Sequence, residues 1–149
     1  MAERRSGSFR PLKGRVVAGM KIEFLFFLIN PGDARNIGSC ARALKTMGHP
    51  RLILVKPAED HLSGAAKALG HKSEDILSNA KVYDSFAEAC ELEKVDLVVG
   101  CTARHRKVLR EYVDCRELNE FLHHKHQISK RVAIVFGNER TGLLSAEIE

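Results

Sequence analysis

The sequence predicts an α/β fold in which a mostly parallel sheet has helices on both faces. Short apolar runs, which suit strands buried on both faces, alternate along the chain with segments of helical period. The first pair is the clearest: residues 22–29 are apolar apart from one Glu, and residues 36–48 follow with helical spacing. Strands that alternate with helices in this way form parallel sheets.

The helix expected over residues 36–48 carries a clear amphipathic pattern. Its apolar side chains recur at helical spacing and predict one buried stripe: Ile37, Cys40, Ala41, Leu44 and Met47. Arg42 falls on the opposite side, so it faces solvent or a ligand. Asn36 is the expected N-cap, and Gly48 suits the left-handed position that ends a helix. Such a strand, loop and helix place a helix N-terminus at the carboxyl edge of the sheet, where α/β proteins bind ligands.

The later elements follow from the same signals. Ser85 and Glu88 form a capping box, which predicts a helix that runs to about residue 93. The other expected elements are a strand at 52–55, a helix at 62–69 ended by Gly70, a turn at 73–75, a strand at 82–83, a strand at 95–100, a helix within 115–125, a strand at 132–136, a loop at 137–142 and a helix start capped by Ser145.

Composition predicts one domain with a basic leader. The 149 residues are 44% hydrophobic and 29% charged, with a net charge of +5. Residues 1–21 hold six of the 24 Lys and Arg and one of the 19 Asp and Glu, which leaves 18 of each sign in residues 22–149. The overall charge of residues 22–149 therefore argues only weakly for RNA binding.

The leader, residues 1–21, lacks apolar periodicity and is expected to be disordered, with Met20 as an alternative start. The functional alternative is an arm that grips RNA. Deleting residues 1–19 should leave the melting temperature unchanged, because nothing in them predicts packing. A large drop would show that they pack, whereas a selective loss of RNA affinity with a weaker salt dependence would favour the arm.

Cysteine and histidine patterns predict neither disulfides nor metal. Four cysteines form no CxxC pair and are interpreted as reduced core thiols of a cytoplasmic protein: Cys40, Cys90, Cys101 and Cys115. His123 and His126 lie three apart, but no acid or Cys follows at ligand spacing, so a solvated helix end is expected. No apolar run reaches the roughly 18 residues of a membrane span.

Several common enzyme classes are disfavoured by missing motifs. The chain has no GxGxxG after its first strand, no GxxxxGK[ST], and no nucleophile elbow. Paired catalytic carboxylates with useful spacing are also missing. The functions that these absences leave open are group transfer from a bound cofactor and binding without catalysis.

Three segments together resemble a known family. They are residues 36–42 with 47–48 (Asn-Ile-Gly-x-x-Ala-Arg, Met-Gly), residues 100–104 (Gly-Cys-Thr-Ala-Arg) and residues 135–143 (Val-Phe-Gly-Asn-Glu-Arg-Thr-Gly-Leu). In order and spacing they resemble the motifs of the SpoU branch of the SPOUT RNA methyltransferases, over residues 22–149. The Thr-Ala-Arg loop is most similar to the bacterial branch that methylates cytidine and uridine riboses in the tRNA anticodon loop.

The resemblance implies a C-terminal trefoil knot, a homodimer, and transfer of a methyl group from S-adenosylmethionine to a ribose 2′-hydroxyl of RNA, most closely tRNA. It implies that Asn36 and Arg42 face the RNA at the catalytic centre and that Glu139, with Asn138, orders the active-site loop. The residues implied to line the cofactor are Thr102, Ala103, Gly137, Asn138, Gly142 and Leu143.

Residue chemistry narrows these roles. Methyl transfer to a hydroxyl is an in-line displacement that needs alignment and no metal. A guanidinium stays protonated in nearly all proteins, so Arg42 is expected to clamp a phosphate and stabilise the developing alkoxide, with base action only in an unusual environment. Glu139 is the competing candidate for proton handling, and holding the loop is its other role.

One departure from the family leaves an alternative open. The family has a third motif, a Ser-Leu-Asn segment on a final strand and helix, and the sequence stops at Glu149 before it. The chain is therefore expected to be truncated or degenerate, with a non-catalytic RNA-binding or dimerisation module as the alternative function.

The 149 residues as they stand are expected to bind S-adenosylmethionine poorly and to transfer no methyl groups, because one wall of the pocket is missing. Enclosure of a flat ligand by the pocket supplies much of the binding affinity, so the expected loss of affinity for S-adenosylmethionine is on the order of a hundredfold or more. Calorimetric titration beside a form extended through its natural continuation tests this. Comparable micromolar binding by both forms would contradict it.

Overall fold

The computed structural model describes residues 22–102, 111–125 and 130–144. Its strands are β1 (Glu23–Ile29), β2 (Leu52–Val55), β3 (Lys81–Tyr83), β4 (Leu97–Cys101) and β5 (Arg131–Phe136). Its helices are α1 (Ala34–Met47), α2 (Gly64–Leu69), α3 (Glu74–Ser78), α4 (Phe86–Leu92) and α5 (Leu118–Lys125). The predicted leader, Ala103, His126 and the predicted cap Ser145 lie outside the described residues.

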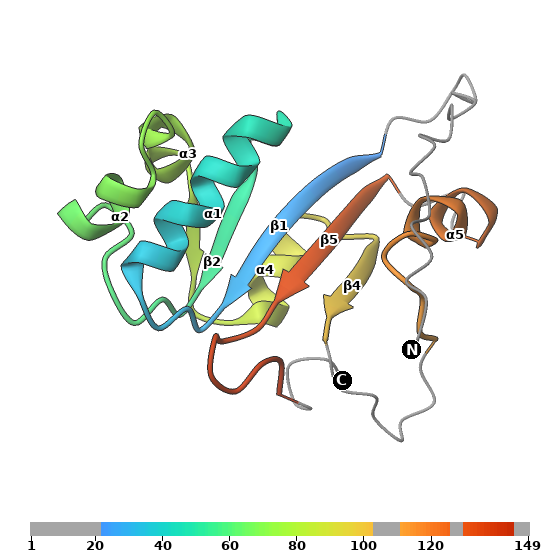
Figure 1. Cartoon of the computed structure of the whole chain (residues 1–149). Helices are drawn as coiled ribbons and strands as arrows, with labels where there is room; N and C mark the ends of the chain where they lie inside the picture. The colour runs from blue at the N-terminus through green and yellow to red at the C-terminus, as the bar shows by residue number, and fades with distance from the viewer. Residues whose placement is uncertain (1–21, 103–110, 126–129, 145–149) are drawn as a thin grey trace, which may run out of the picture.

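The strands form one parallel sheet in the order β3-β2-β1-β5-β4, as Figure 1 shows. On one face, α1, α2 and α3 pack against β1 and β2, while α5 packs against β1, β4 and β5. On the other face, α4 packs against β1, β2 and β5. The predicted α/β fold is thereby confirmed. The trefoil knot implied by the resemblance lies outside the described residues and stays a prediction.

The central strand β1 explains why the sequence has such a long apolar run. Leu25, Phe27 and Ile29 enter the core on the α4 face, whereas Leu28 enters the core on the α1 face. A strand covered on both faces has no solvent side. Its side chains point alternately into two apolar layers, so its sequence is apolar throughout and does not alternate between apolar and polar residues.

The start of α1 differs from the prediction. The helix begins at Ala34, and its N-cap is Asp33, whose carboxylate accepts the Arg35 N–H at 2.8 Å. Asn36 therefore lies inside the first turn, because Asp33 already supplies the side-chain oxygen that a cap requires. The helix ends as predicted at Gly48, which has a left-handed φ of 73°.

The buried stripe of α1 also differs in part. Its buried residues are Ala34, Ile37, Gly38, Ala41 and Leu44. Cys40 is half-buried and Met47 is 71% exposed. At 3.6 residues per turn, both side chains lie roughly 100° from the centre of this stripe, so they reach its margin or miss it. Arg42 is exposed, as predicted.

Gly38 lets α1 approach α2 closely. A methyl group at this position would lie 2.0 Å from the Ala66 carbonyl oxygen and 2.9 Å from the Gly70 nitrogen. Ala66 belongs to the same core cluster as Ile37 and Ala41. Gly38, part of the first family motif, therefore has a packing role.

The variant Gly38→Ala should lower the free energy of unfolding by about 1–3 kcal/mol, since the clash is with backbone atoms. This loss should outweigh the helix-propensity gain of about 1 kcal/mol that alanine normally brings. Urea denaturation measures the net change in the free energy of unfolding. Gly64→Ala is the control, because a methyl group there meets nothing within 4 Å. Equal stability of the Gly38 variant and the parent would contradict the packing role.

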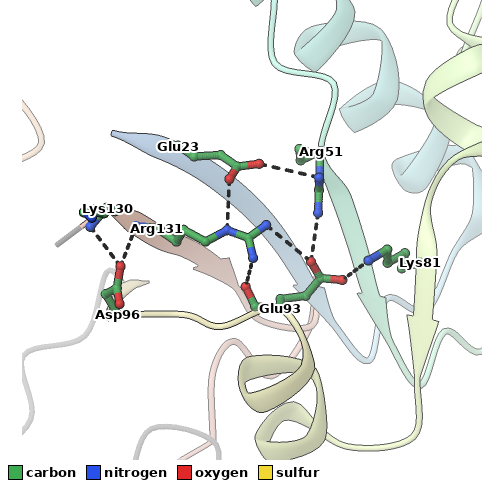
Figure 2. Close-up of polar contacts among 7 residues, drawn as sticks. All are labelled: Glu23, Arg51, Lys81, Glu93, Asp96, Lys130 and Arg131. Atoms are coloured by element: carbon green, nitrogen blue, oxygen red, sulfur yellow. Dashed lines mark hydrogen bonds and ion pairs between the residues drawn. The ribbon is translucent and has the colours of Figure 1, made fainter. Parts of the chain in front are cut away.

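A network of charged side chains ties the amino-terminal edge of the sheet together (Figure 2). The Glu93 carboxylate is 1% exposed and accepts hydrogen bonds from Arg51 at 2.9 Å, Lys81 at 2.6 Å and Tyr83 at 2.6 Å. Arg131 donates to the Glu93 carbonyl oxygen and, at 2.9 Å, to Glu23 at the start of β1. Glu93, just after α4, thus connects side chains from the starts of β2 and β3 through its carboxylate and from the start of β5 through its carbonyl oxygen.

This network shifts two pKa values. Burial raises the pKa of Glu93, but hydrogen bonds from Lys81 and Tyr83 and the charges of Lys81 and Arg51 together hold it below its ordinary value. Burial, with the hydrogen bond to Glu93, raises the pKa of Tyr83 to about 12. At neutral pH the carboxylate is therefore ionised and the phenol is a donor.

The cysteine prediction is correct in part. All four thiols are free, and Cys40 and Cys90 are half-buried, but Cys101 and Cys115 are exposed. Cys101 ends the edge strand β4, and Cys115 precedes α5, so neither reaches the core. Within residues 22–102, 111–125 and 130–144, no three His, Cys, Asp or Glu side chains gather as metal ligands. No helix among them is long and apolar enough to span a membrane.

Candidate active site

The predicted site lies at the carboxyl edge of the sheet, where two loops meet. β1 and β5 are neighbours with Leu28 paired to Phe136, so the loop at 30–33 and the loop at 137–142 leave the sheet side by side (Figure 1). Parallel strands bring their carboxyl ends to one edge, which is why segments far apart in sequence meet there.

Glu139 bridges these loops to α1. One carboxylate oxygen accepts the Gly32 N–H at 3.0 Å, and the other accepts the Asn36 side-chain amide at 3.0 Å across 103 residues of sequence. Two residues from separate family motifs therefore contact each other. Gly32, which no sequence signal marked, contributes through its N–H, since a methyl group there would make only ordinary van der Waals contact with the carboxylate, at 3.4 Å.

Asn138 shapes the second loop and fastens it to β1. Its side-chain amide donates to the Asn30 carbonyl oxygen at 2.7 Å, and its side-chain oxygen accepts the Arg140 N–H at 2.9 Å. Its own carbonyl oxygen accepts the Gly142 N–H at 2.8 Å. Asn30 adopts a left-handed φ of 49° at this junction. These bonds hold the loop at 137–142 against the end of β1.

Both loop glycines are required by the turn itself. A methyl group on Gly137 would lie 2.2 Å from the backbone of Gly142 and Leu143, and Gly142 has a φ of 70°. The Leu143 side chain is 2% exposed and packs in the core with Val135. The Leu143 side chain is therefore part of the core behind the turn.

Thr102 lies beside this turn. Cys101 at the end of β4 pairs with Phe136 at the end of β5, so Thr102 and Gly137 are the next residues of neighbouring strands. Thr102 is exposed at this edge. Ala103, the other residue expected from that motif, lies outside the described residues.

Two arginines lie seven residues apart on one side of α1, but their surroundings differ. Arg35 is held by Asp33, whose two carboxylate oxygens both accept its Nε–H at 3.0 Å. Arg42 is exposed, and its guanidinium makes no hydrogen bond or ion pair with any residue that the structure describes. Arg42 is therefore the arginine of this pair that is available to an anion.

The N-terminus of α1 lies at the carboxyl edge of the sheet, as expected, and its first N–H groups already have partners within the chain. The Ala34 N–H donates to the Glu59 carboxylate at 2.8 Å, and the Arg35 N–H donates to the Asp33 carboxylate at 2.8 Å. The Asn36 N–H donates to the Asp33 carbonyl oxygen. Asp33 had a local signal as an N-cap residue. Glu59, 25 residues away, had none.

The surroundings of Glu139 bear on its chemistry. Burial raises its pKa, but hydrogen bonds from the Gly32 N–H and the Asn36 amide are among several that together hold the pKa below its ordinary value. An ionised carboxylate with both oxygens engaged is a weak base, which favours the loop-holding role. Burial and the Glu139 charge raise the pKa of the nearby Cys40 thiol, so it is no activated nucleophile.

The fold and these contacts define a parallel α/β domain whose candidate site lies at the carboxyl ends of β1, β5 and β4. Asn36 and Glu139 meet there, and Arg42 is exposed farther along α1. The chain belongs to the SpoU rRNA Methylase family, whose model matches residues 23–149.

Relatives and solved structures agree with this assignment. An Escherichia coli protein described as the uncharacterized tRNA/rRNA methyltransferase LasT is 40% identical over 121 residues, which cover 81% of this chain and 52% of that protein. The Pseudomonas aeruginosa tRNA (cytidine/uridine/adenosine-2′-O-)-methyltransferase TrmJ is 37% identical over 122 residues, covering 82% and 46%. The chain thus spans about half the length of these curated relatives.

Among solved structures, a probable methylase family protein from Haemophilus influenzae has a TM-score of 0.74 and 38% identity, covering 85% of this chain and 52% of that one. The SpoU methyltransferase AviRb from Streptomyces viridochromogenes, solved with AdoMet, covers 87% of this chain and 46% of that one. At 20% identity and a TM-score of 0.53, the likeness to AviRb concerns the fold alone.

Proposed function

We propose that this chain carries the catalytic scaffold of an S-adenosylmethionine-dependent RNA methyltransferase that acts on a ribose 2′-hydroxyl, with the tRNA anticodon loop as its target. The observation that carries the proposal is the contact between Asn36 and Glu139, which joins two family motifs at one sheet edge. The substrate class is supported by relatives named as tRNA 2′-O-methyltransferases.

The described walls of the site fit the cofactor. The backbone of the turn at 137–142, with Leu143 behind it, forms one wall, and Thr102 lies beside it at the end of β4. Gly142 is open on the side where a side chain would project. We assign Thr102, Ala103, Gly137, Asn138, Gly142 and Leu143 to this pocket. S-adenosylmethionine, when bound, supplies an electrophilic methyl group.

The roles of the chain's own residues follow from their surroundings. Arg42, exposed and without a described partner, clamps a phosphate beside the reacting ribose and stabilises negative charge that develops on the 2′-oxygen. Glu139 holds the turn against α1 through Gly32 and Asn36. Asn36 presents its other polar atoms toward the RNA.

A second copy of this chain as partner and the cytoplasm as compartment belong to the same proposal. The rival function, a non-catalytic RNA-binding or dimerisation module, gains no support from the relatives reported above, which are described as methyltransferases.

The test is methyl transfer from labelled S-adenosylmethionine to unmodified tRNA, followed by nucleoside analysis. The 149-residue chain should be assayed beside any longer form that its coding sequence specifies. We expect label on a ribose 2′-oxygen in the form that encloses the cofactor. Tight tRNA binding without label in either form would favour the non-catalytic module, and label on a base would overturn the ribose assignment.

A further inference from the structure

The loop that follows β2 is fastened to the start of α1 at two points. The Ala58 N–H donates to the Pro31 carbonyl oxygen at 2.9 Å. The Ala34 N–H donates to a Glu59 carboxylate oxygen at 2.8 Å in a partly buried contact. These bonds lie on either side of Asp33, so they hold the segment that leads from β1 into the helix.

Ala34 is the first residue of α1, and its N–H has no partner within the helix. A carboxylate is a favourable acceptor there, because the helix dipole and the N–H both attract negative charge. Asp33 is occupied with the Arg35 N–H and guanidinium. Glu59 therefore supplies a contact that the helix's own cap does not make.

The same helical turn carries the contact at the proposed active site. Asn36 lies two residues beyond Ala34, and its side chain reaches Glu139 at 3.0 Å. The turn is thus held from two directions, by Glu59 after β2 and by Glu139 after β5. A shift at either point moves Asn36 and, farther along the same rigid helix, Arg42.

We propose that Glu59 is a positioning residue of the methyl-transfer site, which acts by fixing the first turn of α1 so that Asn36 meets Glu139 and Arg42 is correctly presented. The inference rests on the proposed function for its catalytic consequence. Its structural part, the coupling of Glu59 to Glu139, stands separately and is tested separately.

Three variants separate positioning from general stability. Glu59→Ala removes the acceptor, whereas Glu59→Gln removes the charge but keeps an oxygen that accepts the Ala34 N–H. Asp75→Ala is the matched control, because Asp75 contacts the same helix through Lys45 at 2.5 Å, far from the first turn. All three remove one negative charge, and Asp75→Ala reports what loss of a carboxylate contact to α1 does by itself.

The first readout is the pKa of Glu139, measured by carboxyl NMR titration of the full chain. Loss of the Glu59 negative charge acts on this pKa only by lowering it, whereas loosening of the Asn36 contact raises it toward the ordinary value. Asp33, whose backbone lowers the Glu139 pKa, and Cys40, whose thiol pKa the Glu139 charge raises, are unchanged in every variant. We expect a rise in Glu59→Ala, no rise in Glu59→Gln, and no change in Asp75→Ala.

The second readout is the single-turnover rate of tRNA methylation, measured with saturating tRNA and cofactor in the form of the protein that methylates tRNA. Small misplacements of catalytic groups cost up to about a hundredfold, so Glu59→Ala should be at least about tenfold slower with tRNA affinity within a few fold. Glu59→Gln should restore most of the rate. An unchanged or lowered Glu139 pKa in Glu59→Ala, or a rate equal to that of Asp75→Ala, would overturn the inference. A raised pKa together with no methylation by any form of the protein would instead refute the proposed function and leave the coupling intact.

Discussion

In the form of the protein that methylates tRNA, replacing Arg42 by alanine is expected to slow methyl transfer by about a hundredfold or more, while cofactor affinity stays within a few fold. Arg42 is exposed on α1 and lacks a described carboxylate partner, so its charge is available to a phosphate and to the developing alkoxide. The cofactor is assigned to the turns after β4 and β5, which the substitution does not touch. Single-turnover methylation and calorimetric titration measure the two effects.

Two further variants make this result specific. Arg35→Ala removes the same charge from the same side of α1, but from a guanidinium that Asp33 already neutralises, so its loss should be much smaller. Arg42→Lys keeps the charge and loses the planar donor pair, and should recover activity only in part. A normal rate in Arg42→Ala would refute the assignment.

Replacing Glu93 by alanine is expected to lower the free energy of unfolding by about 3–5 kcal/mol. The carboxylate is 1% exposed and accepts hydrogen bonds from Arg51, Lys81 and Tyr83. Removing it leaves their donors without their shared acceptor at the edge where β2, β3 and α4 meet. Urea denaturation at neutral pH measures the loss. Glu91→Ala, an exposed position in the same helix, should change stability by no more than about 0.5 kcal/mol.

The same carboxylate predicts a pH dependence. The pKa of Glu93 in the folded protein lies below its ordinary value, so its stabilising effect is complete above the ordinary glutamate range and is lost as pH falls through the lowered pKa. The stability difference between the parent and Glu93→Gln should therefore be largest at neutral pH and shrink in acid. A difference that is constant from neutral to acid pH would show that the Glu93 charge is unimportant.

Local patterns in the sequence were sufficient for the fold class and most elements. The apolar run of β1, the helical spacing of Ile37, Ala41 and Leu44, and the Ser85 cap each depend on contacts within a few residues or on burial periodicity. Where two N-cap signals lie close together, local pattern does not decide between them. Asn36 and Asp33 are both suitable caps by residue type, and Asp33 caps the helix, three residues earlier than predicted.

The sequence by itself determined that this chain is a parallel α/β domain with the SpoU motifs, and it placed Asn36, Arg42 and Glu139 among the site residues. Only the tertiary structure decided what each of them touches. Asn36 meets Glu139 across 103 residues and Ala34 meets Glu59 across 25, and no local periodicity encodes such contacts. The burial of Glu93 has the same origin, because strand starts from separate parts of the chain surround it. Parallel strands bring distant segments to a common edge. Whether a charged side chain finds an oppositely charged partner there depends on these long-range contacts, which the sequence does not display.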